Sequence, residues 1–261
     1  MAKQSVVSKD GTKIIYDMLG KGPTVILVLG ALNTRKAGAR LAKLLSTHFT
    51  VISYDRRGRG DSADVQPYSP KREVEDLEAL INEVGEPVYL YGHSSGGAIV
   101  FETAILLGKQ IKKLAIYEVP YAVDDAAIRA AKDYNKKLKA LLSGGHKDDA
   151  IALFMQYIGV SDKQTQAMNR LPMWKGLVAM APTLAYDSDL LGSGHAIPTS
   201  HLKHISSPAL IMNGGNSPEF MRIVAERLSK IIPKAQHRSI DGQNHGVKPE
   251  VIAPILTEFF K

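Results

Sequence analysis

The sequence predicts an α/β protein with a mostly parallel central sheet and helices on both faces. Short apolar runs rich in β-branched residues alternate with segments whose apolar residues recur at helical spacing, a pattern typical of parallel sheets. Two earlier runs, residues 4–8 and 13–18, are separated by Asp10-Gly11 and predict an antiparallel hairpin at one edge. The alternating runs are residues 24–29, 49–54, 87–92, 113–118, 208–213 and 235–240.

Two of the expected helices have readable ends. Ser69-Pro70 opens a segment with apolar residues at helical spacing, and Gly85 stops it. A second helix follows Gly97 and ends near Gly108. The apolar residues of the first lie on one side, so we expect that helix to pack a single face on the sheet.

The pattern changes between residues 121 and 203, where strand signals vanish and three or four amphipathic helices follow one another. A capping box from Ser161 to Gln164 opens one of these helices. We therefore expect residues 1–120 and 204–261 to form one core domain, with residues 121–203 inserted into it as a helical lid. A chain of 261 residues is long enough for one such domain.

The composition is that of a globular protein, with 44% apolar and 23% charged residues. No apolar run reaches the length of a membrane span, so we expect no membrane partner. The opening stretch MAKQSVVSKDGTK lacks the apolar core of a secretory signal, which favours a cytoplasmic location. The absence of cysteine excludes disulfides, thiolate catalysis and cysteine-ligated zinc.

The formal charge of +7 raises the question of a nucleic-acid partner, because clustered basic residues neutralise phosphates. The basic residues are scattered, however. The two densest stretches, residues 132–139 and 56–59, lack interleaved aromatic residues. We therefore expect both stretches to belong to solvated faces, and no nucleic-acid partner.

The stretch Gly92-His93-Ser94-Ser95-Gly96 matches the pattern G-x-S-x-G between an apolar strand and a helix. Such a turn strains the central residue and projects its hydroxyl at the carboxyl end of the sheet, so Ser94 is the expected nucleophile. Ser95 follows it, and we expect its backbone N–H rather than its hydroxyl to matter, as an oxyanion donor. The alternative is that this stretch forms a tight strand-to-helix turn and has no catalytic role.

These residues resemble the α/β-hydrolase fold superfamily over nearly the whole chain. LVLGALNTR, residues 27–35, lies where that family has its oxyanion loop, and YDRRGRGDS, residues 54–62, is similar to its D-x-x-G-x-G-x-S stretch. The resemblance implies that the second oxyanion donor is the backbone N–H of Ala31. Leu29 departs from the histidine that many relatives carry, without affecting a backbone donor.

A serine needs a general base within hydrogen-bond reach. His245 lies between the last strand and the last helix, where the resembling family places its base. His195, His201 and His204 form a loose group without the regular spacing of metal ligands, so we expect surface loop residues and no metal site.

The carboxylate that orients the histidine is less obvious. The commonest family position follows residues 208–213, but Gly214-Gly215-Asn216-Ser217 contains no carboxylate. Some relatives carry the acid at the end of the preceding strand, which here ends with Glu118. Glu118 is therefore the expected acid, and Asp187 in the insertion is the alternative.

A lid over the sheet edge would exclude water and shape a pocket. Its apolar and aromatic residues indicate a small, largely apolar substrate, although each could equally belong to the lid's own core. The candidate lining residues are Leu32, Tyr121, Phe154, Met173, Trp174 and Tyr186.

The expected activity is cofactor-independent hydrolysis of an ester or lactone through an acyl-enzyme on Ser94. By the same resemblance, amide or carbon–carbon bond hydrolysis and a cofactor-free peroxidase side activity stay open. The alternative from outside the enzymes is a ligand receptor or interaction module on the same fold that has lost catalysis. Intact Ser94 and His245 argue against it.

Overall fold

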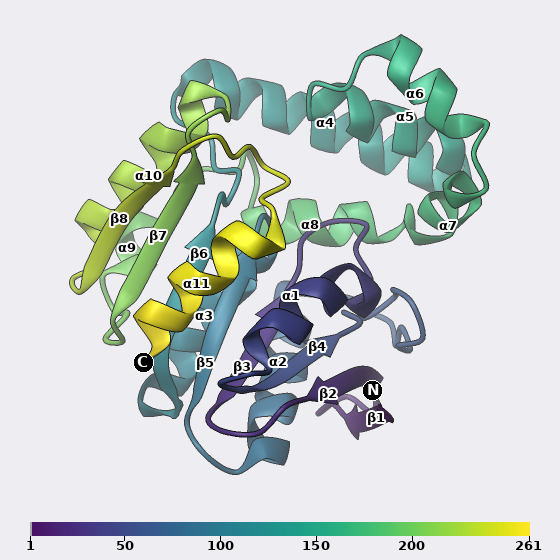
Figure 1. Cartoon of the computed structure of the whole chain (residues 1–261). Helices are drawn as coiled ribbons and strands as arrows, with labels where there is room; N and C mark the ends of the chain where they lie inside the picture. Colours follow the sequence, from purple (N-terminus) through teal and green to yellow (C-terminus); the bar gives the residue numbers. More distant parts are fainter. Residues whose placement is uncertain (1) are drawn as a thin grey trace.

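A computed structural model describes residues 2–261 as one eight-stranded sheet with helices on both faces and a helical insertion (Figure 1). The strand order is β1-β2-β4-β3-β5-β6-β7-β8. β2 pairs antiparallel with β1 and β4, and every other pair is parallel. The strands are β1 (Ala2–Val7), β2 (Lys13–Leu19), β3 (Thr24–Val28), β4 (Thr50–Tyr54), β5 (Val88–His93), β6 (Ile111–Tyr117), β7 (Ala209–Gly214) and β8 (Ala235–Ile240).

The predicted fold class is confirmed, including the edge hairpin of β1 and β2. Each of the predicted parallel strands is present at its expected place in the chain. The runs were readable because parallel strands are covered on both faces and so consist largely of apolar residues.

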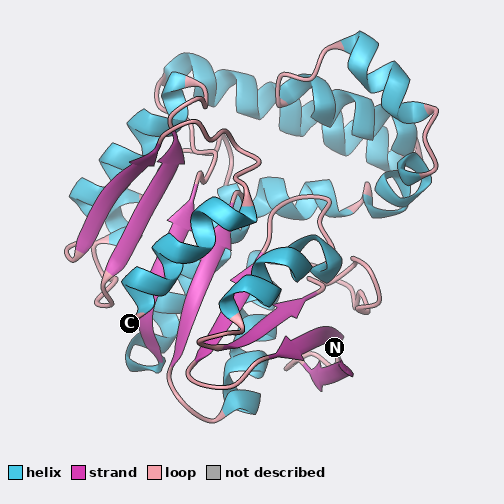
Figure 2. Ribbon diagram, in the orientation of Figure 1, coloured by secondary structure: helices cyan, strands magenta, loops and turns pink. Residues whose placement is uncertain are grey.

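Successive residues of the central strands face opposite sides of the sheet, and both sides are buried. In β3, Ile26 and Val28 pack under one layer of helices, whereas Val25 and Leu27 pack under the other. Figure 2 shows the two layers of helices against the sheet. One layer holds α2 (Pro70–Val84), α3 (Gly96–Leu107) and α10 (Glu219–Ile231), and the other holds α1 (Ala39–Leu45) and α11 (Pro249–Phe260).

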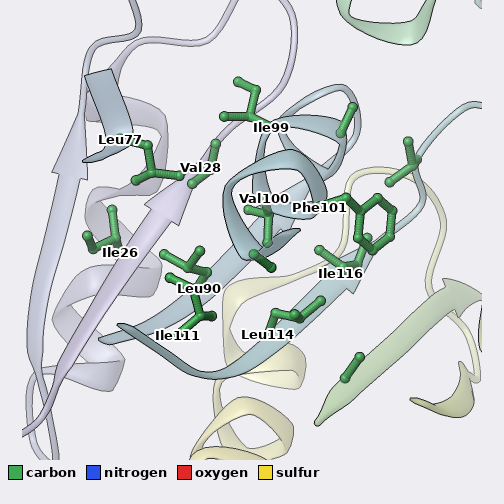
Figure 3. Close-up of a cluster of buried hydrophobic side chains, with 14 of the residues drawn as sticks. Ile26, Val28, Leu77, Leu90, Ile99, Val100, Phe101, Ile111, Leu114 and Ile116 are labelled. Carbon is green, nitrogen blue, oxygen red and sulfur yellow. The ribbon is translucent and has the colours of Figure 1, made fainter. Parts of the chain in front are cut away.

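The core beneath α3 is continuous with the strands on either side of it. Ile26, Leu90 and Ile116 come from three neighbouring strands and meet Val100 and Phe101 of α3 (Figure 3). Burying such side chains stabilises the fold by about 1.5–3 kcal/mol each. This packing holds the start of α3 firmly at the end of β5.

The ends of α2 are those that the sequence predicts. Ser69 precedes the helix, Pro70 is its first residue, and Gly85 adopts φ 72° just beyond its last turn. A left-handed residue at this position is a common helix stop that glycine accommodates without a steric penalty.

The insertion between β6 and β7 contains more helices than the three or four that we predicted. The described residues form six: α4 (Asp125–Ser143), α5 (Lys147–Tyr157), α6 (Asp162–Asn169), α7 (Met173–Met180), α8 (Thr183–Leu191) and α9 (Thr199–Leu202). Several are two turns or shorter, and so short a segment does not establish a helical period in the sequence. The predicted capping box of Ser161 and Gln164 is present at the start of α6.

The insertion lies over the edge where the parallel strands end (Figure 1). It has an apolar cluster of its own, which includes Leu138 of α4, Ile151 of α5 and Leu184 of α8. α8 also contacts α2 and α3, and α9 contacts α3 and α10, so these two helices join the insertion to the core. Within residues 2–261, no helix combines the length and apolar character needed to cross a membrane.

Candidate active site

Ser94 lies in the tight turn that joins β5 to α3. Its φ is 55°, in the left-handed region that few residues other than glycine adopt, and such strain costs on the order of 1–3 kcal/mol. The turn also needs glycine at position 96, because a Cβ there would lie 2.2 Å from the carbonyl oxygen of Val28. The small residues around Ser94 thus let α3 start directly against β3.

The loop after β3 lies directly against Ser94. A Cβ on Gly30 would lie 2.7 Å from the Cβ of Ser94 and 3.1 Å from its Oγ, so this loop can approach only without a side chain. Among residues 2–261, no acceptor is found for the backbone N–H of Ala31 or of Ser95. Within these residues both N–H groups therefore lack an acceptor, and that of Ser95 lies at the N-terminal end of α3, where a negative charge is favoured.

His245 and Glu118 meet although the sequence separates them by 127 residues. His245 Nδ1 lies 2.8 Å from Glu118 Oε2, and the backbone N–H of Gly214 donates to Glu118 Oε1 at 2.7 Å. The Glu118 side chain is fully buried, whereas that of His245 is 43% exposed. Burial alone would raise the pKa of Glu118, but these hydrogen bonds outweigh it and hold that pKa below its usual value. The carboxylate is therefore ionised at neutral pH.

The segment Gly214-Gly215-Asn216-Ser217 does not replace the missing carboxylate with another acid. Its contribution is the backbone N–H of Gly214, which binds Glu118 from the neighbouring strand. Glu118 itself adopts φ 52°, just beyond the end of β6. β6 and β7 are adjacent in the sheet, so an acid on either strand can reach the same loop.

Two side chains that the sequence reading passed over hold the loop of His245. Tyr117 Oη donates to the carbonyl of Asn244 at 2.6 Å, and His93 Nε2 donates to the carbonyl of His245 at 2.9 Å. Burial and the charge of His245 lower the pKa of His93 to about 4, so His93 is neutral at neutral pH. His93 ends β5 beside Ser94, and Tyr117 ends β6 beside Glu118. These positions in the sequence could have identified both residues as candidates for the site.

Asp187, the alternative acid, has other partners. Its carboxylate accepts from Arg56 Nη1 at 2.8 Å, from Arg59 Nη2 at 2.7 Å and from Ser95 Oγ at 2.7 Å. Burial would raise the pKa of Asp187, but the two guanidinium groups and the hydrogen bonds hold it below its usual value. Of the two candidate acids, the structure brings only Glu118 to His245.

The expectation that residues 56–59 form a solvated face is wrong. Arg56, Arg57 and Arg59 are all buried, each with at most 2% of the residue exposed. Arg57 forms two hydrogen bonds with Asp76 of α2, at 2.7 and 2.8 Å. The carboxylates that neutralise these arginines come from distant parts of the chain, so the local sequence shows only the positive half of each pair.

Three of the six candidate pocket residues belong to the apolar cluster of the insertion. Leu32, beside Ala31, and Phe154 of α5 pack against this cluster and are partly exposed. Trp174 is buried within it and donates through Nε1 to Asp148 at 2.8 Å. Trp174 therefore stabilises the insertion, whereas Leu32 and Phe154 have surface left for a ligand.

The other three candidate pocket residues lie elsewhere. Tyr121 is buried in the main core, under the helices that include α3. Met173 is 53% exposed on the surface of the insertion. Tyr186 stacks on Tyr68 with ring centroids 3.7 Å apart and donates to Asp64, so its ring and hydroxyl are already occupied. Aromatic content alone did not separate lining residues from packing residues.

A cavity of about 440 Å³ opens where the insertion joins the core, and Ser94 is not among its lining residues. Both connecting segments of the insertion line it, together with the end of α10. Of the residues described, neither Ser94 nor His245 reaches it. The lining residues are Ala122, Val123, Asp124, Asp125, Ile128, Ala196, Ile197, Thr199, Arg227, Lys230 and Ile231.

His195 is buried, contrary to our expectation of a surface residue. It is 3% exposed, with Tyr157 Oη 3.2 Å from Nδ1 and Asn135 Nδ2 3.4 Å from Nε2. The expectation failed because the partners come from α4 and α5, far from His195 in sequence. His201 is exposed, as expected, and no group of three potential metal ligands is found in residues 2–261.

Buried His195 should make the stability of the protein depend on pH. Burial lowers its pKa to about 4, below the usual value near 6.5, so between these values the unfolded chain binds more protons than the folded one. The free energy of unfolding should therefore fall as the pH is lowered from about 6.5 to about 4. The free energy of unfolding, measured by urea unfolding at a series of pH values, should depend less steeply on pH in His195→Gln. The slope of this free energy against pH should be smaller by up to about 1.4 kcal/mol per pH unit.

The matched control for this measurement is His204→Gln, because His204 is also a histidine at the exit of the insertion but is exposed. The control should keep the slope of the unaltered protein. An unchanged slope in His195→Gln would contradict a buried neutral imidazole at this position.

A mixed sheet of this order, an insertion after β6 and a strained serine between β5 and α3 define an alpha/beta hydrolase. The chain belongs to the alpha/beta hydrolase family, whose model matches residues 26–253.

Known proteins agree with this assignment. The structure of an alpha/beta hydrolase from Sphaerobacter thermophilus is 44% identical, covers 99% of this chain and 100% of its own, and has a TM-score of 0.89. The (E)-2-((N-methylformamido)methylene)succinate hydrolase of Acinetobacter baylyi is 26% identical over 89% of this chain and 87% of its own length. A thermophilic esterase from Thermogutta terrifontis shares the fold at 20% identity and a TM-score of 0.72, over 100% of this chain and 98% of its own.

Proposed function

We propose that this protein is a serine hydrolase that cleaves an ester or lactone of a small, largely apolar molecule. Ser94 is the nucleophile, His245 the general base, and Glu118 the carboxylate that orients His245. The backbone N–H groups of Ala31 and Ser95 form the oxyanion hole. No cofactor takes part in this proposal.

The observation that carries the proposal is the contact of 2.8 Å between His245 Nδ1 and Glu118 Oε2. With Nδ1 bound to a buried carboxylate, the imidazole is held with Nε2 available to take a proton from Ser94. A buried, ionised carboxylate also stabilises the imidazolium that this proton transfer creates. A histidine that only packed in a loop would not need such a partner.

In the proposed reaction, Ser94 Oγ attacks the carbonyl carbon while His245 takes its proton. The carbonyl oxygen becomes an oxyanion that accepts hydrogen bonds from the N–H groups of Ala31 and Ser95. The bond to the leaving oxygen breaks, and His245 gives that oxygen its proton. Water then repeats the sequence on the acyl-enzyme, releasing the acid and restoring Ser94.

The apolar surroundings support an apolar acyl group. Leu32 follows Ala31 directly, and both residues pack against the apolar cluster of the insertion, as Phe154 does. A substrate whose carbonyl lies between Ser94 and Ala31 would meet these side chains, which have no charge to pair with an ionic group.

A second candidate is the hydrolysis of a bond other than an ester. The relative from Acinetobacter baylyi acts on a succinate that carries an N-methylformamido group, and this similarity favours testing amides beside esters. The same nucleophile, base and oxyanion donors would serve that reaction.

The test combines active-site labelling with a substrate series. A fluorophosphonate probe should add to Ser94, as located by peptide mass spectrometry, and the absence of this adduct would contradict the serine hydrolase. p-Nitrophenyl esters of increasing acyl length, lactones and matched amides should then show turnover highest for esters or lactones. Rates near background for every ester and lactone would overturn the proposed substrate class.

A further inference from the structure

Asp187 connects the insertion to the residue that follows the nucleophile. It lies on α8, is 6% exposed, and accepts a hydrogen bond of 2.7 Å from the hydroxyl of Ser95. Ser95, whose hydroxyl we expected to have no role, is itself buried. A carboxylate from the insertion therefore holds the side chain of Ser95, the residue whose backbone N–H is one of the two proposed oxyanion donors.

Arg56 extends the same connection to the other oxyanion donor. Its Nη1 donates to Asp187 at 2.8 Å and also to the carbonyl of Leu29 at 3.3 Å. Leu29 comes just before Gly30 and Ala31, in the loop that lies against Ser94. One guanidinium thus contacts the start of the oxyanion loop and the carboxylate that holds Ser95.

The guanidinium of Arg56 is itself rigidly held. Glu73 of α2 binds it through two hydrogen bonds, from Nε at 2.8 Å and from Nη2 at 2.7 Å, and both side chains are buried. Such paired hydrogen bonds fix the direction of the guanidinium plane as well as its position. The remaining nitrogen, Nη1, therefore reaches Leu29 and Asp187 from a fixed point in the core.

We propose that Asp187 is a positioning residue that, together with Arg56, sets the spacing of the two oxyanion donors and makes this spacing depend on the position of α8. This inference rests on the proposed function. Oxyanion donors act only within a narrow range of distance, and a misplacement of about 1 Å can cost about a hundredfold in rate. The insertion thus acts on the chemistry as well as covering the site.

The first test is Asp187→Asn, which keeps the shape of the side chain and removes its charge. We expect kcat for a p-nitrophenyl ester to fall about tenfold to a hundredfold, with KM changed less than about twofold. A trifluoromethyl ketone, whose carbon adds Ser94 Oγ and whose oxygen becomes the oxyanion, should bind more weakly by the factor that kcat/KM loses. Loss of stability alone would not produce this parallel change.

The matched control is Asp76→Asn, because Asp76 forms an equally buried pair with Arg57 and contacts neither Ser95 nor Leu29. It should lower Tm to a comparable extent and leave kcat and the ketone affinity unchanged. If Asp187→Asn changes only Tm, as this control does, the inference is wrong.

Ser95→Ala provides a second variant in case Asp187→Asn does not fold. It removes one hydroxyl and keeps the backbone N–H, so we expect a smaller loss of kcat, about threefold to tenfold, again with weaker ketone binding. Because both changes act through one contact, their effects in the double variant should not add. If Ser95→Ala keeps full kcat and ketone affinity, the inference is wrong. The proposed function is tested separately, by fluorophosphonate labelling of Ser94 in the unaltered enzyme, and stands if that label is found.

Discussion

Replacing Ser94 with alanine should lower kcat for an activated ester by about 10⁶-fold, to the level that binding and the oxyanion donors alone can support. The structure explains why no neighbouring group should take over. The hydroxyl of Ser95, one residue away, donates to Asp187 and is buried. The measurement is the steady-state rate with p-nitrophenyl esters, together with the loss of the fluorophosphonate adduct.

Ser143→Ala is the control, because Ser143 is an exposed residue at the end of α4 whose hydroxyl bonds only to the local backbone. It should leave kcat and Tm unchanged. Alanine at position 94 should preserve Tm, because either residue must adopt the same strained φ of 55°. Undiminished turnover in Ser94→Ala would exclude a serine nucleophile at this position.

Replacing Glu118 with glutamine should lower kcat by about 10⁴-fold, as expected when the carboxylate that orients a catalytic histidine loses its charge. Glutamine can still accept the N–H of Gly214 through its carbonyl oxygen, so the local fold should persist. The amide cannot stabilise an imidazolium, and its NH₂ group favours the wrong tautomer of His245. The loss should appear in kcat rather than in KM, since Glu118 is buried away from the substrate.

Asp187→Asn distinguishes the two candidate acids, because it makes the same chemical change on the alternative residue. We expect a loss at least a hundredfold smaller than that of Glu118→Gln, and of different origin, since Asp187 faces Arg56, Arg59 and Ser95. A collapse of turnover in Asp187→Asn with near-normal rates in Glu118→Gln would show that the assignment of Glu118 is wrong.

Residues of the candidate site could be proposed from the sequence where a short local pattern specifies the geometry of the backbone. G-x-S-x-G around Ser94 and the place of His245 between the last strand and the last helix each follow from short stretches of sequence. Glu118 could be proposed because it comes directly after the strand next to the one that usually carries the acid. These expectations needed only the order of the strands, which apolar periodicity predicts well.

The sequence reading failed where partners come from distant segments. Residues 56–59 looked like a solvated basic stretch, yet Arg56 and Arg59 are neutralised by Glu73 of α2 and Asp187 of α8. Tyr121, Trp174 and Tyr186 looked like pocket residues, but two are buried in apolar clusters and the third stacks on Tyr68. Burial and pairing depend on the whole fold, so no local pattern reports them.

The sequence by itself determined the alternation of strands and helices, the strained turn at Ser94 and the order along the chain of Ser94, the two candidate acids and His245. These features depend on side-chain periodicity and on glycines at positions of close approach, which are local properties. Only the tertiary structure decided which carboxylate meets His245 and that Asp187 is bound to Arg56 and Ser95 instead. The physical reason is that a buried charge must be paired where the fold places it, and the partner can come from any part of the chain.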